Sequence, residues 1–482
     1  MLLERLYDDA LAQASYLIAC ESTRDAIVID PQRDIRRYEE AAGREKVRIV
    51  MVTETHIHAD FLSGSHDLAR RTGAKLLLSD AGGAQWRYAF APRDDVRLLH
   101  HGDTFDLGKV RFTVRHTPGH TPEHICFLVT DTASNPEPVG MLTGDFIFAG
   151  EVGRPDLLER AARQAGTMES LARVLFRSLQ ATSDLHEYLQ LWPGHGPGSA
   201  CGKSLGAMPS TTMGYERIAN WAFQVKDEDE FVRRVLDGQP EPPKYFARMK
   251  SLNRDGPPPA PDVDEPLPKL DRAALQQARR QGLSIVDVRS TADFAAGHIQ
   301  RTLNIPVGTS FPTWAGALLP YDRDIVILAD DEDRLRRART MLAQVGHDRV
   351  VATAGRDVRE AWTREVGALE CTEQIGVGTL AAGTDRLIVD VRGRPEWETG
   401  HIPGAEHRYL GDLLTSMLSV PRDTPIAVHC QGGTRSAIAA SLLQAEGFTD
   451  VANIKGGIRA WHDAGLPVIA DSSNHSHNDQ TP

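Results

Sequence analysis

Histidine and aspartate alternate in the stretch THIHADF, where His56, His58 and Asp60 occupy every second position. Imidazole and carboxylate groups are common protein ligands of transition-metal ions. A histidine at position 61 would complete a pattern that holds two metal ions, and this chain has Phe61 instead. The apolar ring removes one ligand from the second site, so the stretch favours a single ion.

Three glycine-rich turns further along the chain supply more candidate ligands. His120 lies in RHTPGHTPEH, Asp145 in MLTGDF and His195 in WPGHGPG. Turns at the ends of strands often carry binding residues, because the strands hold them rigidly. Together with THIHADF, these turns follow the order found in the metallo-β-lactamase superfamily, which the chain resembles over most of residues 1–250. The resemblance implies an αββα sandwich over residues 1–239.

One branch of that superfamily, the persulfide dioxygenases, is similar to this chain in the same motifs. Its members bind one iron ion through two histidines and one aspartate. The resemblance implies one Fe(II) per chain with His56, His120 and Asp145 as ligands, a set that leaves open positions on the ion. His58 is then either a support for the ligands or a further ligand.

Two other residues in this half are candidates for the reaction. Arg154, in AGEVGRPDL, corresponds to an arginine near the thiol substrate in the family that the chain resembles. It either binds a persulfide or a carboxylate, or it forms a surface salt bridge. Cys201, in SACGKS, either faces the open metal position or packs in the interior.

A second chemical site is predicted in VHCQGGTRSAIAASLL, which places Cys430 between an apolar strand and an alanine-rich helix. Backbone N–H groups at a helix N-terminus attract negative charge, which favours the thiolate and makes the cysteine a nucleophile. Gly432 and Gly433 permit the tight turn, and Ser436 follows in the helix. Arg435 offers a planar fork for an incoming oxyanion.

Residues 375–470 resemble the rhodanese family in the pieces DVRGRPEWETGHIPGA, CQGGTRS and GGIRAWHDAGLPV. The resemblance implies that Cys430 carries a sulfane sulfur as a persulfide. An earlier copy, over 269–371, repeats the Asp-Val-Arg triplet with its Asp287 lying 103 residues before Asp390. Its loop has Ala329 in place of the cysteine, followed by acidic residues that repel anions. We therefore expect this copy to be inactive.

The segments between these sites predict the elements that position them. Short β-branched runs such as DAIVID, VRIVMVT and HICFLVT alternate with helical patterns in the first half, which indicates buried strands. Each later copy reads as strand, loop, strand, loop and helix, a pattern typical of a small α/β unit with a parallel sheet. The proline-rich stretch 240–268 predicts a surface linker, and the polar tail 471–482 predicts disorder.

The composition of the 482-residue chain narrows the classes of function. A net charge of −12 argues against non-specific binding of nucleic acid or anionic membranes. There is no apolar run long enough to span a bilayer and no secretory pattern at the N-terminus. Five widely spaced cysteines are typical of a reducing cytoplasm. The oligomeric state stays open, with a homo-oligomer as one option.

The chain as a whole resembles bacterial fusions of a persulfide dioxygenase with an inactive and an active rhodanese domain. The resemblance implies a sulfide-detoxifying enzyme that uses Fe(II) and O2. Its substrate would be a low-molecular-weight thiol persulfide, such as that of glutathione or coenzyme A, which yields sulfite and thiol. The Cys430 persulfide would form or consume thiosulfate. The alternatives are a zinc-dependent thioester hydrolase resembling glyoxalase II, and a sulfur carrier that does not oxidise its substrate.

Overall fold

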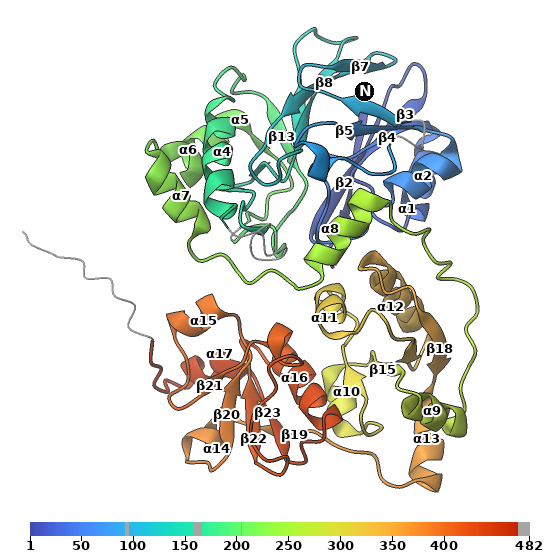
Figure 1. The fold of residues 1–482 in the computed structure, drawn as a ribbon, viewed down its shortest axis with the longest axis vertical. Coiled ribbons are helices and arrows are strands. Elements are labelled where there is room, and N and C mark those ends of the chain that lie inside the picture. The colour runs from blue at the N-terminus through green and yellow to red at the C-terminus, as the bar shows by residue number, and fades with distance from the viewer. Residues whose placement is uncertain (92–95, 158–165, 204, 471–482) are drawn as a thin grey trace, which may run out of the picture. The chain divides into compact units, whose positions relative to one another are not determined.

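The computed structural model describes residues 1–91, 96–157, 166–203 and 205–470 (Figure 1). The predicted disordered tail, 471–482, lies outside these residues. The chain forms two compact units, each built from three segments. The first contains Met1–Glu265, Gly308–Tyr321 and Arg336–Asp348, and the second contains Pro266–Val307, Asp322–Leu335 and Arg349–Pro482. Two segments of the predicted inactive copy therefore fold with the N-terminal part of the chain.

Two six-stranded sheets form the centre of the first unit. The strands of the first sheet follow chain order: β1 (Leu2–Asp8), β2 (Gln13–Ala19), β3 (Asp25–Ile29), β4 (Arg48–Thr53), β5 (Lys75–Ser79) and β6 (Val96–Leu99). The second sheet has the order β14-β13-β10-β9-β8-β7. Its strands are β7 (Thr104–Leu107), β8 (Val110–His116), β9 (Ile125–Asp131), β10 (Gly140–Gly144), β13 (Gln190–Pro193) and β14 (Thr211–Thr212). A short hairpin, β11 (Ile147–Phe148) and β12 (Glu151–Val152), follows β10.

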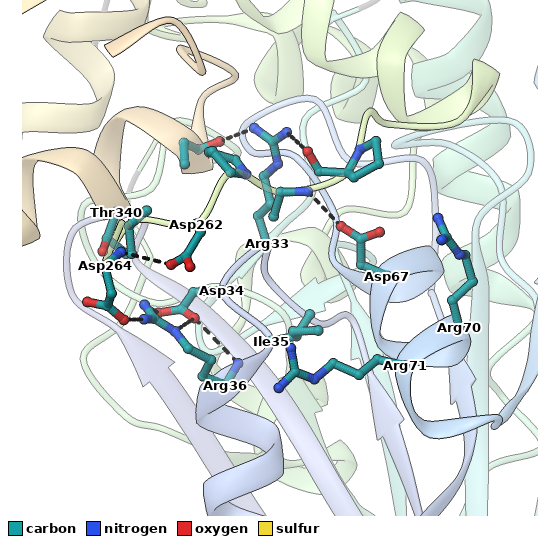
Figure 2. A pocket seen from close by; sticks show the side chains of 15 residues that line it. Arg33, Asp34, Ile35, Arg36, Asp67, Arg70, Arg71, Asp262, Asp264 and Thr340 are labelled. Atoms are coloured by element: carbon teal, nitrogen blue, oxygen red, sulfur yellow. Dashed lines mark hydrogen bonds and ion pairs between the residues drawn. The ribbon is translucent and has the colours of Figure 1, made fainter. Parts of the chain in front are cut away.

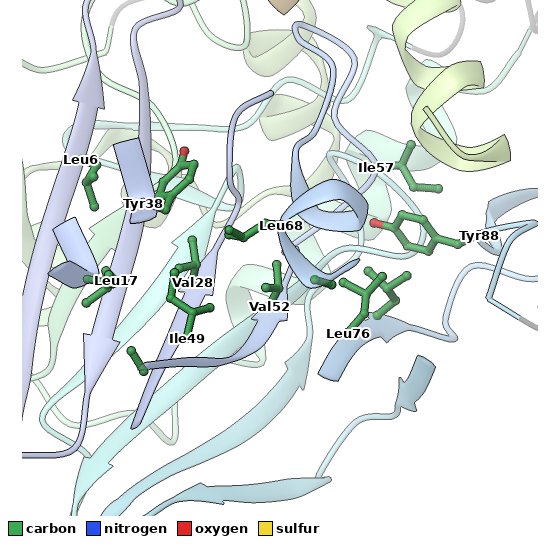
Figure 3. Packing of buried hydrophobic residues seen from close by; sticks show 14 of the residues in the cluster. Leu6, Leu17, Val28, Tyr38, Ile49, Val52, Ile57, Leu68, Leu76 and Tyr88 are labelled. Atoms are coloured by element: carbon green, nitrogen blue, oxygen red, sulfur yellow. The ribbon is translucent and has the colours of Figure 1, made fainter. Parts of the chain in front are cut away.

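Alternating apolar side chains bury both faces of the first sheet. Helices α1 (Arg36–Glu45) and α2 (Ser65–Thr72) cover its outer face. Leu17 of β2 and Val28 of β3 point to that face and pack in one cluster with Tyr38 of α1 (Figure 3). Their neighbours along each strand point the other way, because successive residues of a strand face opposite sides. These neighbours form the core between the two sheets.

Helices α4 (Met168–Gln180) and α7 (Glu228–Leu236) cover the outer face of the second sheet. Leu175 of α4 and Phe231 of α7 share a buried cluster with Leu191 of β13. The layers thus run helix, sheet, sheet, helix, which confirms the predicted αββα sandwich. Further helices among the described residues of this unit include η1 (Ala84–Trp86), α5 (Met213–Ala219), α6 (Trp221–Gln224), α8 (Phe246–Asp255) and α11 (Phe311–Leu318).

Helix α8 lies within the stretch 240–268 that the sequence predicts to be a surface linker. Phe246 and Met249 of this helix are buried in a cluster with Leu62 and Val345. The linker prediction is therefore wrong over residues 246–255. Prolines on both sides of the helix concealed an apolar pattern that recurs at helical spacing.

Two parallel sheets form the centre of the second unit, as predicted. One has the order β16-β15-β17-β18, with β15 (Ser284–Asp287), β16 (Leu303–Asn304), β17 (Ile325–Leu328) and β18 (Val350–Ala354). The other has the order β19-β23-β22-β20-β21, with β19 (Glu373–Ile375), β20 (Leu387–Asp390), β21 (Glu406–His407), β22 (Ile426–His429) and β23 (Val451–Ile454).

Helices surround both parallel sheets. Those of the first copy are α9 (Arg272–Arg280), α10 (Thr291–Ala296), α12 (Glu332–Gln344) and α13 (Arg356–Glu365). Those of the second copy are α14 (Val377–Ala381), α15 (Arg394–Thr399), η2 (Leu410–Asp412), α16 (Thr434–Ala445) and α17 (Gly457–Asp463). Within the described ranges, no helix combines the length and the apolar character needed to cross a membrane.

The two copies share a buried ion pair that follows their equivalent strands β15 and β20. Arg289 Nη2 lies 2.6 Å from Asp287 Oδ2, and Arg392 Nη2 lies 2.7 Å from Asp390 Oδ2. The first copy therefore keeps this part of the scaffold, and its inactivity stays a prediction that depends on the loop after β17.

Helix α16, which follows Cys430, is covered on every side. All its residues from Ser436 to Gln444 are buried. The hydroxyl of Ser441 accepts a hydrogen bond of 3.0 Å from the backbone N–H of Asn304, at the end of β16. A helix that is apolar all round is stable only inside a core. The inactive copy therefore supplies part of the core that encloses this helix.

Candidate metal centre and cysteine loop

Three of the predicted ligands converge in the first unit. His56 follows β4, His120 lies in the turn between β8 and β9, and Asp145 follows β10. Asp145 Oδ2 lies 3.4 Å from His120 Nε2 and 3.9 Å from His56 Nε2. Their ligand atoms all lie within 4.8 Å of one another, and all three side chains are buried. The structure thus brings together residues that are 89 positions apart between the first and the last.

Hydrogen bonds orient both imidazoles toward this gap. His120 Nδ1 donates to the carbonyl of Arg154 at 2.9 Å. Thr55 Oγ1 donates to Asp30 and therefore accepts from His56 Nδ1, also at 2.9 Å. Each ring thus carries its proton on Nδ1 and presents the Nε2 lone pair. Burial lowers the pKa of both histidines, which keeps the rings neutral.

Asp145 provides the test of whether a metal ion fits. Its Oδ2 is buried and has no hydrogen-bond partner, although an unpaired carboxylate oxygen in the interior is costly. The oxygen faces two neutral imidazole nitrogens, and a divalent transition metal prefers this donor set. The three residues therefore fit a metal ion.

His195 orients Asp145 instead of joining this set. Its Nδ1 contacts Asp145 Oδ1 at 2.7 Å, and its Nε2 contacts Asp60 Oδ2 at 2.8 Å. Burial alone would lower the pKa of His195, but the two carboxylates outweigh it and raise the pKa to about 10. The charged ring donates from both nitrogens. Asp60, His195 and Cys201 form a second group whose ligand atoms lie within 4.8 Å of one another.

His58 and Phe61 lie beside the centre. His58 Nε2 lies 3.2 Å from Asp30 Oδ1. Burial lowers the pKa of His58, but Asp30 outweighs it and raises the pKa to about 9. Phe61 is fully buried, and its ring centroid lies 4.5 Å from that of His58. His58 thus lies in the position of a support, and the choice between support and ligand stays a prediction.

His124 is a functional neighbour that the sequence left without a role. Its Nε2 accepts a hydrogen bond of 3.1 Å from the backbone N–H of Asp145, and its Nδ1 bonds to Thr117 Oγ1 at 2.8 Å. The ring stacks on His56 with centroids 5.1 Å apart. The sequence signal that could have identified this role is the position of His124, four residues after His120 in RHTPGHTPEH.

Arg154 is fully buried, so the alternative of a surface salt bridge is wrong. Its Nε and Nη2 each lie 2.7 Å from a carboxylate oxygen of Asp156, and its Nη1 donates to the carbonyl of Ala200 at 3.0 Å. Arg154 therefore supports the segment that carries Cys201. Burial, together with Asp145 and Asp60, raises the pKa of the Cys201 thiol well above its usual range. Direct substrate binding by either residue stays a prediction.

Cys430 follows β22 in the second unit, at the start of the short loop that leads into α16. Its Sγ is buried and accepts hydrogen bonds from the Gly433 N–H at 3.1 Å and from Ser436 Oγ at 3.5 Å. Gly433 has a φ of +108°, a conformation that favours glycine. A Cβ on Gly432 would meet nothing within 4 Å, so the loop is open at that point. Two donors therefore converge on the sulfur of Cys430, and its role as a nucleophile stays a prediction.

Arg435 lies against a carboxylate. Its two terminal nitrogens contact the two oxygens of Glu396 at 2.6 and 2.7 Å. Burial lowers the pKa of Arg435, but Glu396 outweighs it and raises the pKa. Glu396 belongs to α15, which the sequence did not connect with the cysteine loop. The predicted oxyanion-binding fork is therefore already paired in this structure.

The loop of the first copy has different contacts. Ala329 stands where the second copy has Cys430, and the next residue, Asp330, pairs with Arg359 at 2.6 Å. Arg359 is buried. An ion pair therefore takes the place of the sulfur site in this copy.

Comparisons with known proteins match both halves of the chain. The Metallo-beta-lactamase superfamily model matches residues 8–195, and the Rhodanese-like domain model matches residues 271–355 and 377–464. The sequence is 30% identical over 290 residues to the hydroxyacylglutathione hydrolase of Polaromonas sp., covering 58% of this chain and 100% of that protein. It is 36% identical over 91 residues to a sulfurtransferase of Allochromatium vinosum, covering 19% of this chain and 85% of that protein.

A solved structure extends over more of the chain. The 2.1 Å crystal structure of a metallo-beta-lactamase from Staphylococcus aureus is similar to it with a TM-score of 0.66 and 37% sequence identity. The match covers 73% of this chain and 98% of that one.

Proposed function

Because the chain belongs to the metallo-beta-lactamase superfamily in its first half and carries two rhodanese-like domains in its second, we propose that it detoxifies sulfide by two linked reactions. The first oxidises a low-molecular-weight thiol persulfide with O2 and one Fe(II) per chain. With O2 and water, RSSH gives RSH and sulfite. The second transfers a sulfane sulfur through Cys430.

The observation that carries the first reaction is the partnerless Oδ2 of Asp145, which faces the Nε2 atoms of His56 and His120. A ferrous ion held by two imidazoles and one carboxylate supplies redox chemistry with O2 and keeps positions open for a substrate sulfur. Cys201 lies beside Asp60 and His195, next to this set. In the proposal, its thiol contacts the persulfide.

The second reaction uses the loop of Cys430. Its Sγ attacks the outer sulfur of a persulfide, the thiol leaves, and the new S–S bond stores the sulfane sulfur on the enzyme. Sulfite then takes the outer sulfur and forms thiosulfate. The N–H of Gly433 and the hydroxyl of Ser436 stabilise the thiolate that remains. The reverse direction uses the same groups.

Metal analysis combined with oxygen uptake tests the proposal. We expect about one iron per chain and O2 consumption with glutathione persulfide or coenzyme A persulfide. Cys430→Ser is the matched control, because it should keep O2 uptake and abolish sulfur transfer to or from thiosulfate. Stoichiometric zinc without O2 uptake would contradict the first reaction.

A zinc-dependent thioester hydrolase is the second candidate. The donor group of Asp60, His195 and Cys201 favours it, since a second ion there would give the paired metals that suit hydrolysis. The similarity to a hydroxyacylglutathione hydrolase points the same way. Two zinc ions per chain and hydrolysis of a glutathione thioester would select this candidate over the dioxygenase.

A further inference from the structure

Asn253 of α8 bonds to three backbone groups of the loop that follows the metal motif. Its Nδ2 donates to the carbonyls of His58 and Phe61, both at 2.8 Å. Its Oδ1 accepts from the N–H of Ser63 at 2.9 Å. Asn253 is only 2% exposed, so water does not replace these bonds. One amide therefore fixes the backbone on both sides of Asp60.

Asp60 connects this loop to the candidate ligand Asp145 through His195. Its carboxylate contacts His195 at 2.8 Å, and the other nitrogen of His195 contacts Asp145 Oδ1 at 2.7 Å. The chain of contacts therefore determines which oxygen of Asp145 faces His56 and His120. Groups that orient metal ligands in this way commonly change metal affinity when they are altered.

The end of α12 and the residues after it close the same loop. The N–H of Leu62 donates to the carbonyl of Gln344 at 2.8 Å. Val345 is buried in the cluster that contains Leu62 and Met249. Gly346 has a φ of +78°, and a Cβ there would lie 3.0 Å from Met249 Cε and 3.4 Å from Leu62 Cδ1. There is little room to displace either chain.

Arg33 anchors this end of α12 to the first sheet. Its guanidinium contacts both oxygens of Asp348, at 2.5 and 2.8 Å, and the carbonyl of Ala343 at 2.7 Å. It also reaches the carbonyl of Pro258 at 3.2 Å. The Arg33 side chain is 2% exposed and the Asp348 side chain is 28% exposed, so the pair is partly shielded from solvent. A bidentate pair of this kind favours one arrangement of the segments it joins.

Figure 2 shows the cavity beside Arg33, about 570 Å³ in volume, where α2, residues 259–264 and α12 meet. Most of its arginines are already paired: Arg36 with Asp34 and Asp264, and Arg71 with Glu39. Asp264 also pairs with Arg336 of α12 at 2.7 Å, which links that helix to the residues that line the cavity.

We propose that Asn253 and residues 344–346 position the metal centre, and that the segment 336–348, which folds with the first unit, serves as a brace for the loop 58–63. This role goes beyond the proposed reaction, because it applies equally to an iron or a zinc centre. Asn253 is a positioning residue in this proposal, since it acts through Asp60 and His195.

Asn253→Asp tests the amide with little change of shape. The new carboxylate cannot donate to the carbonyls of His58 and Phe61, so the loop should loosen. We expect the full-length, metal-loaded protein to release its metal to a chelator about tenfold faster. The absorption spectrum of the cobalt-substituted protein should also shift, which a role in folding alone would not cause. Asn453→Asp is the matched control, as an equally buried asparagine in the active copy.

Two glycines test the brace independently. Gly346 and Gly282 both follow a helix with positive φ, +78° and +81°, so alanine strains the backbone equally at both. A Cβ meets Met249 and Leu62 at position 346 and nothing within 4 Å at position 282. We expect Gly346→Ala to speed metal release several-fold and to shift the cobalt spectrum, and Gly282→Ala to do neither. Equal behaviour of the two variants would exclude the brace, and an unchanged release rate and spectrum in Asn253→Asp would exclude the positioning residue.

Discussion

His195 and Asp145 are joined by a hydrogen bond of 2.7 Å that occupies only one of the two carboxylate oxygens. The other oxygen, Oδ2, has no hydrogen-bond partner and points at two imidazole nitrogens. The bond to Oδ1 therefore fixes the orientation of the carboxylate, and Oδ2 stays available as a metal ligand. This arrangement leaves one carboxylate oxygen and two imidazole nitrogens as candidate ligands around the gap.

Asp145→Asn should nearly abolish metal binding. The amide carries no charge and is a weaker ligand, so we expect metal content to fall from about one to below about a tenth of an equivalent per chain. Elemental analysis of the purified variant measures this directly. Asp287→Asn is the matched control, because it changes an equally buried carboxylate of the inactive copy and should retain the metal. Full metal content in Asp145→Asn would rule out Asp145 as a ligand.

Cys430 should be the site of stored sulfur. After incubation with thiosulfate, we expect the intact mass to rise by one sulfur atom per chain, and Cys430→Ser should lose this gain. The sulfur of Cys430 accepts hydrogen bonds from the Gly433 N–H and the Ser436 hydroxyl, which favour sulfur transfer at this position. Cys371→Ser serves as the control, since Cys371 is an exposed free thiol and should not affect the result. A sulfur adduct that persists in Cys430→Ser would assign the sulfur to another residue.

Arg435→Lys should weaken sulfur transfer without touching the metal centre. Lysine keeps the charge but loses the two-pronged contact with Glu396, so the loop loses its tie to α15. We expect the rate of sulfur transfer from thiosulfate to cyanide to fall about tenfold, with metal content unchanged. The aligned residue of the inactive copy, Arg334, supplies the control variant Arg334→Lys. Equal rates in the two variants would show that the Glu396 contact does not support the loop.

His347 should make the first unit sensitive to mild acid. Burial lowers its pKa from 6.5 to about 4, and the ring bonds to the carbonyl of Ala315 at 3.1 Å. Because the folded pKa lies below the unfolded one, the neutral ring contributes fully above about pH 6.5, and the contribution is lost as the pH falls toward 4. The difference between the unfolded and folded pKa values of His347 corresponds to about 3 kcal/mol of unfolding free energy.

Thermal unfolding at pH 7.5 and pH 5 measures this effect of His347. We expect His347→Gln to lower the midpoint temperature of unfolding at pH 7.5. At pH 5, the midpoint temperatures of the variant and the unaltered protein should lie closer together. His100→Gln is the control, because the His100 side chain is 62% exposed. A constant difference between the two pH values would contradict the assigned role.

The sequence predicted the ligand positions better than it predicted what orients them. His56, His120 and Asp145 occur in short turns after strands. Such turns can be recognised in a sequence, and they often carry binding residues. The sequence allows two roles for both His58 and Arg154. The choice depends on their contacts with Asp30 and Asp156, and no local sequence pattern predicts these contacts. The sandwich was implied by the resemblance of the turn motifs to a known superfamily. The buried strands and the parallel sheets followed from apolar patterns, which are a local property of the sequence.

Long-range contacts could not be predicted in the same way. Asn253 is 195 residues from His58, and Gln344 is 282 residues from Leu62, so a single sequence contains no sign that they meet. The helix of Asn253 was also hidden by flanking prolines. Glu396 is the intermediate case. It lies in a predicted motif, yet its pairing with Arg435 depends on how the starts of α15 and α16 come together.

The burial of α16 from Ser436 to Gln444 bears on how this protein can be divided into fragments. A fragment that began at residue 372 would keep Cys430 and its loop but would lose the β16 edge, leaving the Ser441 side of the helix facing water. Such a fragment would expose an apolar helix surface and tend to self-associate. We therefore expect gene truncations that isolate the copy with Cys430 to yield insoluble protein unless the preceding copy is retained.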